Sequence, residues 1–169
     1  MCLVLGVWSG AGWGSAAAQA TASATARCDA SHVHYTPYEG IQAGLAPIPW
    51  IAASPSSTGL VGHLFYYDGF SVWKQKRLPL LRIYAGGQSP DGRVNMKILW
   101  ELKHGSAPGL HIQGKRLDGV GSFSQRLQGG GVQFPSIVDV PRRGCWQLTL
   151  TGGRVSAKVV VIAAPGKTG

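Results

Sequence analysis

The chain has 169 residues, of which 44% are apolar and 14% carry a charge. That length suits one domain with a substantial core and hardly two, and the apolar content excludes a chain that stays disordered throughout. The 16 Lys and Arg against 7 Asp and Glu give a formal net charge of +9, which favours anionic partners such as wall polymers, polysaccharides, lipid headgroups or nucleic acid, although it can also serve solubility alone.

Residues 1–26 have the composition of an export leader rather than of a folded element. An apolar run is followed by small residues and by an Ala-Gln-Ala site that ends at Ala20, which predicts cleavage near Ala20 or Ala26. No Lys or Arg precedes the apolar run, so a truncated start and an uncleaved leader are the alternatives. No later stretch has the roughly 20 apolar residues that a membrane-spanning helix needs. We therefore expect a secreted or cell-envelope protein with no transmembrane span in the mature chain.

Export changes what the cysteines can do. Of three cysteines, Cys2 departs with the leader and leaves Cys28 and Cys145, which are 117 positions apart. A lone pair in an oxidising compartment usually bridges, so we predict a disulfide, with two free buried thiols as the alternative. Closing so long a loop stabilises a fold by roughly 4 to 5 kcal/mol in the chain-entropy model.

The rest of the chain is predicted to be an all-β domain preceded by an arm. Residues 27–48 combine aromatic residues with glycine and proline breaks, which predicts an ordered arm with one edge strand. Residues 49–163 alternate short apolar runs with turn signals and contain no 3.6-residue period, and residues 164–169 form a disordered tail. About eight or nine strands at this spacing indicate a two-sheet antiparallel sandwich of the immunoglobulin type or a barrel. In chain order the clearest strand segments are WIAAS, LVGHLFYY, LLRIYA, VNMKILWEL, LHIQGKRL, VGSFSQRL, CWQLTL and VSAKVVVIA.

Two turns are specified by their glycines. Asp118-Gly119 lies between LHIQGKRL and VGSFSQRL and is a favoured pair for a two-residue hairpin turn. Residues 151–154, Thr-Gly-Gly-Arg, join the last two strands. Both connections therefore predict antiparallel hairpins.

The stretch from residue 134 to residue 150 sets the orientation of the penultimate strand. Gly144, Trp146 and Leu148 keep the spacing found at the tyrosine corner of immunoglobulin domains, with Trp in the place of Tyr. Trp146, Leu148 and Leu150 share one face, which we expect to be the core. Cys145 then faces away from the core, so the arm that carries Cys28 should lie over the outer face and be fixed there.

The same stretch resembles a protein family. F-P-S at residues 134–136, Pro141 and G-C-W-x-L at residues 144–148 resemble a signature of small secreted or lipid-anchored bacterial proteins of unknown function. The runs GLVGHLFYY, KILWEL and GKRLDGVGSF extend the resemblance over residues 47–163. It implies an immunoglobulin-like sandwich, and it provides neither an established activity nor catalytic residues.

The segment FYYDGFSVWKQKR, residues 65–77, is the favoured binding surface. It places five aromatic residues within nine positions and follows them with three cations. Aromatic faces stack on sugars or bases, and nearby cations hold anionic groups. Phe65 and Tyr67 alternate with Tyr66 and should fill the core. The predicted binding patch comprises Tyr66, Phe70, Trp73, Lys74, Lys76 and Arg77.

Two histidines suggest a metal site as an alternative. His32 and His34 stand two apart, and on a strand this spacing puts both imidazoles on one face, as zinc and copper sites require. Nothing in the spacing selects a third ligand, and exposed polar histidines on an edge strand explain the pair without any metal. The candidates for the remaining ligands are His63, His104, His111 and Glu39.

Enzyme and nucleic-acid motifs are weak in this chain. GVGSFSQ lacks the closing glycine of a nucleophile elbow, and the terminal PGKTG lacks the first glycine of a phosphate loop. Asp68, Asp91 and Asp118 each precede a turn glycine, which turn chemistry explains. A hydrolase whose Ser, His and Asp are scattered in sequence stays an alternative, since geometry defines such a site. No motif for specific nucleic-acid binding is present.

These observations together predict a secreted, non-catalytic binding or interaction module of the bacterial cell envelope. The expected partner is an anionic envelope polymer, a glycan or another protein, and no cofactor is expected. An extracellular protein that binds zinc or copper through His32 and His34 is the first alternative, and an extracellular hydrolase is the second.

Overall fold

A computed structural model describes residues 28–38, 48–65, 79–87 and 97–165 of the chain. These residues form nine strands and two short 3-10 turns, whereas the predicted leader lies outside them. No helix among them is long and apolar enough to cross a membrane. The elements are β1 (Trp50–Ala52), η1 (Ser56–Thr58), β2 (Leu60–Phe65), β3 (Arg82–Tyr84), η2 (Ala85–Gly87), β4 (Lys97–Leu102), β5 (Leu110–Arg116), β6 (Ser122–Leu127), β7 (Gln133–Ile137), β8 (Gly144–Gly152) and β9 (Val155–Ala164).

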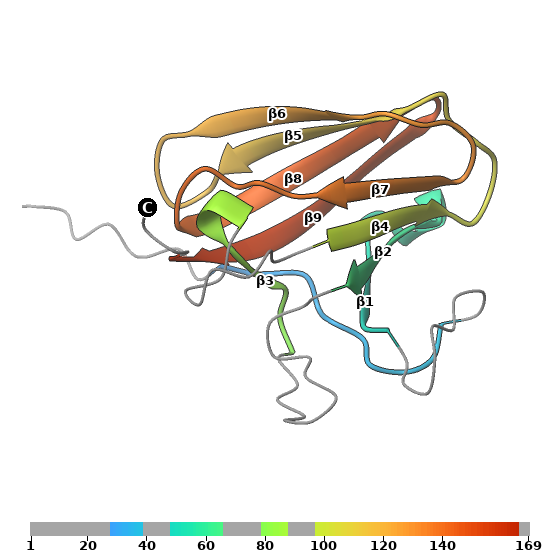
Figure 1. The fold of residues 1–169 in the computed structure, drawn as a ribbon. Helices are drawn as coiled ribbons and strands as arrows, with labels where there is room; N and C mark the ends of the chain where they lie inside the picture. Colours follow the sequence, from blue (N-terminus) through green and yellow to red (C-terminus); the bar gives the residue numbers. More distant parts are fainter. Residues whose placement is uncertain (1–27, 39–47, 66–78, 88–96, 166–169) are drawn as a thin grey trace, which may run out of the picture.

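The strands form two sheets that lie in two layers (Figure 1). One sheet has the order β1-β2-β4-β7 and the other β3-β9-β8-β5-β6, which confirms the predicted all-β sandwich. The expectation of purely antiparallel pairing is wrong at one position, because β3 pairs parallel with β9. Parallel neighbours need a long connection rather than a hairpin, and here the connection is most of the domain. Local turn signals therefore gave no indication of this pairing.

The alternating pattern of the sequence explains the core between the two sheets. Ile98, Trp100 and Leu102 of β4 face inward at 0%, 0% and 3% exposure, as their spacing predicted. Trp146 at the start of β8 enters the same core from the opposite sheet. Since successive side chains of a strand point to opposite faces, the intervening residues of both sheets face outward.

Glycines in the strands make room for the large aromatic rings. A Cβ on Gly114 of β5 would overlap the ring of Phe123, its partner on β6. That ring packs edge-on against Trp146 at a centroid distance of 5.7 Å. On the other sheet, Gly62 of β2 lies beneath Trp100, whose ring is 2.9 Å from the place of a Cβ. The glycines inside β2 and β5 are thus required for packing.

The two predicted hairpins differ in outcome. Gly152 pairs with Val155 and Gly153 has a φ of 56°, so the predicted tight turn between β8 and β9 is confirmed. The two-residue turn at Asp118-Gly119 is wrong, because β5 and β6 are joined by residues 117–121. The hydrogen bond from Arg116 N to Gly121 O closes this longer loop. The side chain of Asp118 has another role, described below.

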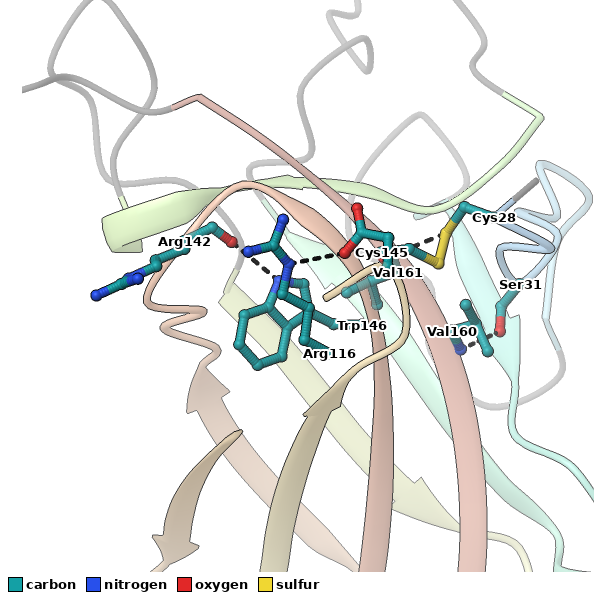
Figure 2. Close-up of a disulfide and its surroundings, with 9 residues drawn as sticks. Cys28, Ser31, Arg116, Arg142, Cys145, Trp146, Val160 and Val161 are labelled. Carbon is teal, nitrogen blue, oxygen red and sulfur yellow. Dashed lines mark hydrogen bonds and ion pairs between the residues drawn. A yellow bond between two sulfur atoms is a disulfide. The ribbon is translucent and has the colours of Figure 1, made fainter. Parts of the chain in front are cut away.

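The N-terminal arm is fixed to the sandwich by the predicted disulfide. Cys28 and Cys145 are joined by an S–S bond of 2.03 Å, with their Cα atoms 5.5 Å apart (Figure 2). Cys145 points to the outer face of its sheet and is covered there, in agreement with the sequence analysis. A second attachment follows at Ser31, which accepts a hydrogen bond from Val160 N and donates its own N–H to Val160 O.

The described strands extend from Trp50 to Ala164, one residue beyond the expected limit of the domain. Most of the predicted tail lies outside the described residues. The domain boundaries at residues 26, 48 and 163 therefore stay predictions.

Candidate functional site

The predicted aromatic and basic patch lies outside the described residues. All six of its members fall between residues 66 and 78, whose placement is not described: Tyr66, Phe70, Trp73, Lys74, Lys76 and Arg77. The patch therefore stays a prediction, and the candidate site is sought on the described surfaces.

The histidine pair of the arm does lie together. The rings of His32 and His34 have centroids 5.2 Å apart, and His34 stacks on Trp50 of β1 at 4.2 Å. Burial, and then the positive charge of His32, lower the pKa of His34. A lowered pKa keeps the imidazole neutral, which is the form that binds metals. The pair is held against the four-stranded sheet by backbone bonds between His34 and Trp50 in both directions.

The other proposed ligands are not brought to this pair. His63 is fully buried and bonds Glu101, with 2.9 Å between its Nε2 and Oε2, while His111 lies 2.7 Å from the hydroxyl of Ser124. Within the part of the chain that the structure describes, no three His, Cys, Asp or Glu side chains gather to hold a metal ion. Glu39 falls outside that part. Among the described residues, the metal hypothesis therefore depends on His32 and His34.

His63 and Glu101 form an acid–base pair that the sequence analysis did not identify. They project from β2 and β4 on the outer face of the four-stranded sheet. Tyr38 of the arm covers this face, with its ring edge-on to His63 at 5.1 Å and tilted against Trp50 at 4.9 Å. Because His63 has 0% exposure, a substrate cannot reach it. The pair therefore serves to seat the arm on the sheet.

Asp118 lies in the loop between β5 and β6, where an ion pair with Arg116 holds its side chain. The Nε of Arg116 donates to its Oδ1 at 2.7 Å. Burial alone would raise the pKa of Asp118, but the hydrogen bonds from Arg116 and from the backbone of Cys145, with the charge of Arg116, lower it overall. Of the three aspartates that precede a turn glycine, Asp118 alone is described, and its carboxylate is paired with Arg116.

The pocket between β3 and β9 is too small for a ligand of metabolite size. It has a volume of about 70 Å³ and is lined by Arg82, Ile83, Tyr84 and Ala164. Small-molecule sites usually measure about 300 Å³ or more. A larger, extended partner needs an open surface instead.

The outer face of the five-stranded sheet is such a surface, and its side chains follow from the strand register. Three rows run across β6, β5, β8 and β9, since alternate residues face outward and partners lie side by side. None of these twelve residues is buried. The rows are Ser122-Lys115-Gln147-Val160, Ser124-Gln113-Thr149-Lys158 and Arg126-His111-Thr151-Ser156. We call these twelve residues the polar face.

The polar face carries positive charge without compensation from its own members. Lys115, Arg126 and Lys158 are exposed cations, and none of the twelve residues is Asp or Glu. Strands about 4.8 Å apart and alternate residues about 6.8 Å apart place these cations roughly 12 to 16 Å from one another. Ser, Thr, Gln and His side chains between them offer hydrogen-bond donors and acceptors. The face can therefore hold an extended anionic ligand along several repeats.

Sequence reasoning missed this face although its signal was present. Each strand alternates apolar with polar residues, and the register needed to align four such strands depends on pairings that the sequence analysis did not attempt. Comparisons of this chain with protein-family models, with curated proteins and with solved structures find no match. The candidate site accordingly rests on the geometry of the polar face.

Proposed function

We propose that this protein is a secreted, non-catalytic binding module whose polar face holds an anionic polymer of the cell envelope. The observation that carries the proposal is the composition of the face, with three exposed cations and no acidic residue among its twelve side chains. A flat sheet suits a linear polymer, because each repeat can lie along successive rows. The formal net charge of +9 adds long-range attraction to the same class of ligand.

Secretion is part of the proposal and has its own support. The Cys28–Cys145 disulfide is typical of proteins that fold in an oxidising compartment. Residues 1–26 have the composition of an export leader. In this proposal the predicted aromatic and basic patch, which includes Trp73 and Lys74, binds the same polymer at a second place.

We also assign the sandwich to the immunoglobulin-like class. The order β9-β8-β5-β6 follows that of the G, F, C and C′ strands of variable-type domains. The indole Nε1 of Trp146 donates to Arg142 O at 2.9 Å, which supports a corner of the tyrosine-corner kind at the start of β8. An immunoglobulin-like sandwich is compatible with a binding module, but the fold by itself selects no ligand.

The test removes the cations of the polar face and leaves the rest of the surface intact. The variant is Lys115→Gln/Arg126→Gln/Lys158→Gln, and the matched control is Arg142→Gln/Arg143→Gln/Arg154→Gln, which changes three exposed cations elsewhere. Co-sedimentation with insoluble polygalacturonate and with poly(glycerol phosphate)-coated beads at two salt concentrations distinguishes carboxylate from phosphate polymers. Neutral dextran beads give the background.

We expect the polar-face variant to bind at least ten-fold more weakly and to lose most of its salt dependence, because fewer counterions are then released. The control should lose less than three-fold, since only the general attraction between net charges is reduced. Equal losses in the two variants, or binding that ignores salt, would show that the polar face is not the site.

A further inference from the structure

The two sheets have four edges, and three of them are unsuited to an additional strand. The arm pairs with β1, since His34 N donates to Trp50 O at 2.8 Å and Trp50 N donates back at 3.0 Å. The arm also pairs with the segment that leads into β3, where Val33 N donates to Pro79 O and Leu81 N donates to Ser31 O. Both edges are thus occupied by residues of the same chain.

The edge at β7 is closed in a different way. Leu102 N donates to Val132 O, and hydrogen-bonded residues alternate along an antiparallel strand. The even-numbered residues of β7 therefore bond β4, and the backbone groups of residues 133, 135 and 137 point to the free edge. Pro135 has no N–H to offer at this edge. The carbonyl of Ile137 already accepts a bond of 2.8 Å from the side chain of Gln125. A further strand would therefore find few partners on β7.

The edge at β6 is open in the described structure. Arg116 N donates to Gly121 O, so the odd-numbered residues of β6 bond β5, and Ser122, Ser124 and Arg126 direct their N–H and C=O groups to the free edge. All three residues are exposed. β6 runs along the upper margin of the molecule in Figure 1, at the end of its sheet. Three donors and three acceptors thus form a regular row, the pattern that accepts an additional strand.

We propose that β6 is a docking edge that takes up an extended acidic segment of a partner protein as a sixth strand of the sheet. Charge selects the partner: Arg126 flanks the edge directly, Lys115 stands on the adjacent strand, and the polar face beside them has no carboxylate. Alternate side chains of the added strand would lie on the same side of the sheet as this face and next to Ser122, Ser124 and Arg126, so acidic residues at every second position suit it. A second copy of this chain carries the same cations and the same +9 charge and is disfavoured.

This docking edge can be tested separately from the polymer proposal. The same cations select an acidic partner, but the backbone groups of β6 bind only an extended peptide. Ser124→Pro removes one N–H from the free edge and leaves the bonds to β5 intact, as Pro135 does naturally on β7. Ser124→Ala is the control, since both changes remove the hydroxyl bonded to His111 and only proline removes the N–H.

The probes are synthetic nonapeptides with Glu at every second position and Thr or Val between them. Matched peptides carry Lys in place of Glu, or N-methyl groups on alternate amides. Binding to the full chain is measured by fluorescence anisotropy, and amide hydrogen exchange of Ser122, Ser124 and Arg126 is followed by NMR. If Ser124→Pro fails to fold, the unmodified protein still tests the proposal. Its binding of the acidic peptide is then compared with its binding of the N-methylated peptide, which lacks the N–H groups needed at the edge.

We expect the acidic peptide to bind and to slow exchange of the three edge amides at least ten-fold, while the Lys peptide and the N-methylated peptide do not. Ser124→Pro should weaken binding at least ten-fold and Ser124→Ala less than three-fold. Three results would overturn the proposal: no binding of the acidic peptide at millimolar concentration, binding without protection of these amides, or a dimer of this chain that Ser124→Pro abolishes.

Discussion

At the scale of single residues, the turn into β8 depends on a glycine that no other residue can replace without cost. Gly144 has a φ of 138°, and a Cβ there would lie 2.7 Å from Asp118 Oδ1 and 2.8 Å from Arg116 Nε. The Arg116–Asp118 ion pair therefore occupies the space that a side chain would need. The sequence pattern identified Gly144 by its spacing to Trp146 and Leu148, and the structure adds the ion pair as the reason for a glycine there.

Gly144→Ala tests this dependence. We expect a loss of about 1 to 3 kcal/mol in the free energy of unfolding, from an unfavourable φ and from displacement of the ion pair. Gly129→Ala is the matched control, because Gly129 has a similar φ of 129° and nothing within 4 Å of its Cβ position. Urea denaturation of both variants separates the two causes. Equal losses of unfolding free energy in the two variants would mean that displacing the Arg116–Asp118 ion pair does not destabilise the fold.

At the scale of elements, Trp146 fixes the connection between β7 and β8. Its ring lies in the core at 1% exposure, and its Nε1 donates to Arg142 O across the turn (Figure 2). A hydrogen bond of this kind contributes about 0.5 to 1.5 kcal/mol. The indole therefore couples the path of the turn to the packing of the sandwich.

Trp146→Phe is expected to destabilise the fold by about 2 to 4 kcal/mol, from lost volume and the lost hydrogen bond. Amide exchange of residues 141–144 should accelerate more than that of β8. Trp100→Phe is the control, since Trp100 is equally buried and its Nε1 donates to Ser136 Oγ at 3.0 Å in the middle of the other sheet. Similar acceleration of residues 141–144 in both variants would contradict the local role of Trp146.

The elements that sequence predicted well are those whose pattern is local. The alternation in β4 and the glycines between β8 and β9 identified a strand and a hairpin, because side-chain direction and turn conformation depend on neighbouring residues. The parallel pairing of β3 with β9 and the seating of Tyr38 on His63 depend on residues far apart in sequence. The two-residue turn at Asp118-Gly119 was wrong in part for the same reason, since the side chain of Asp118 also accepts a hydrogen bond from the backbone of the distant Cys145.

At the scale of the whole molecule, the arm and the two sheets act as one structure because distant contacts join them. Cys28 reaches β8, Ser31 reaches β9 and His34 reaches β1. The polar face could not be predicted because its twelve side chains come from four strands whose register is a property of the complete sheet. The disulfide could be predicted from three features of the sequence: the leader-like composition of residues 1–26, the two cysteines that follow them, and the outward direction of Cys145.

The disulfide closes a loop of 117 residues, so its removal should affect the entire domain. In the chain-entropy model, Cys28→Ser/Cys145→Ser loses roughly 4 to 5 kcal/mol of unfolding free energy. Thermal and urea unfolding of this variant, and of the original protein with and without reductant, measure the loss in two independent ways. Amide exchange should also show residues 28–31 opening before His34, which keeps its bonds to Trp50.

Ser31→Ala is the control for this loss, because it removes the hydrogen bond from Val160 N at the same end of the arm and keeps the disulfide. It should cost about 1 kcal/mol and leave exchange near Cys28 slow. An unfolding midpoint that does not change on reduction would contradict the role of the disulfide. That result would place the attachment of the arm in Ser31, His34 and Tyr38, whose contacts with β9, β1 and β2 would then be sufficient to hold it.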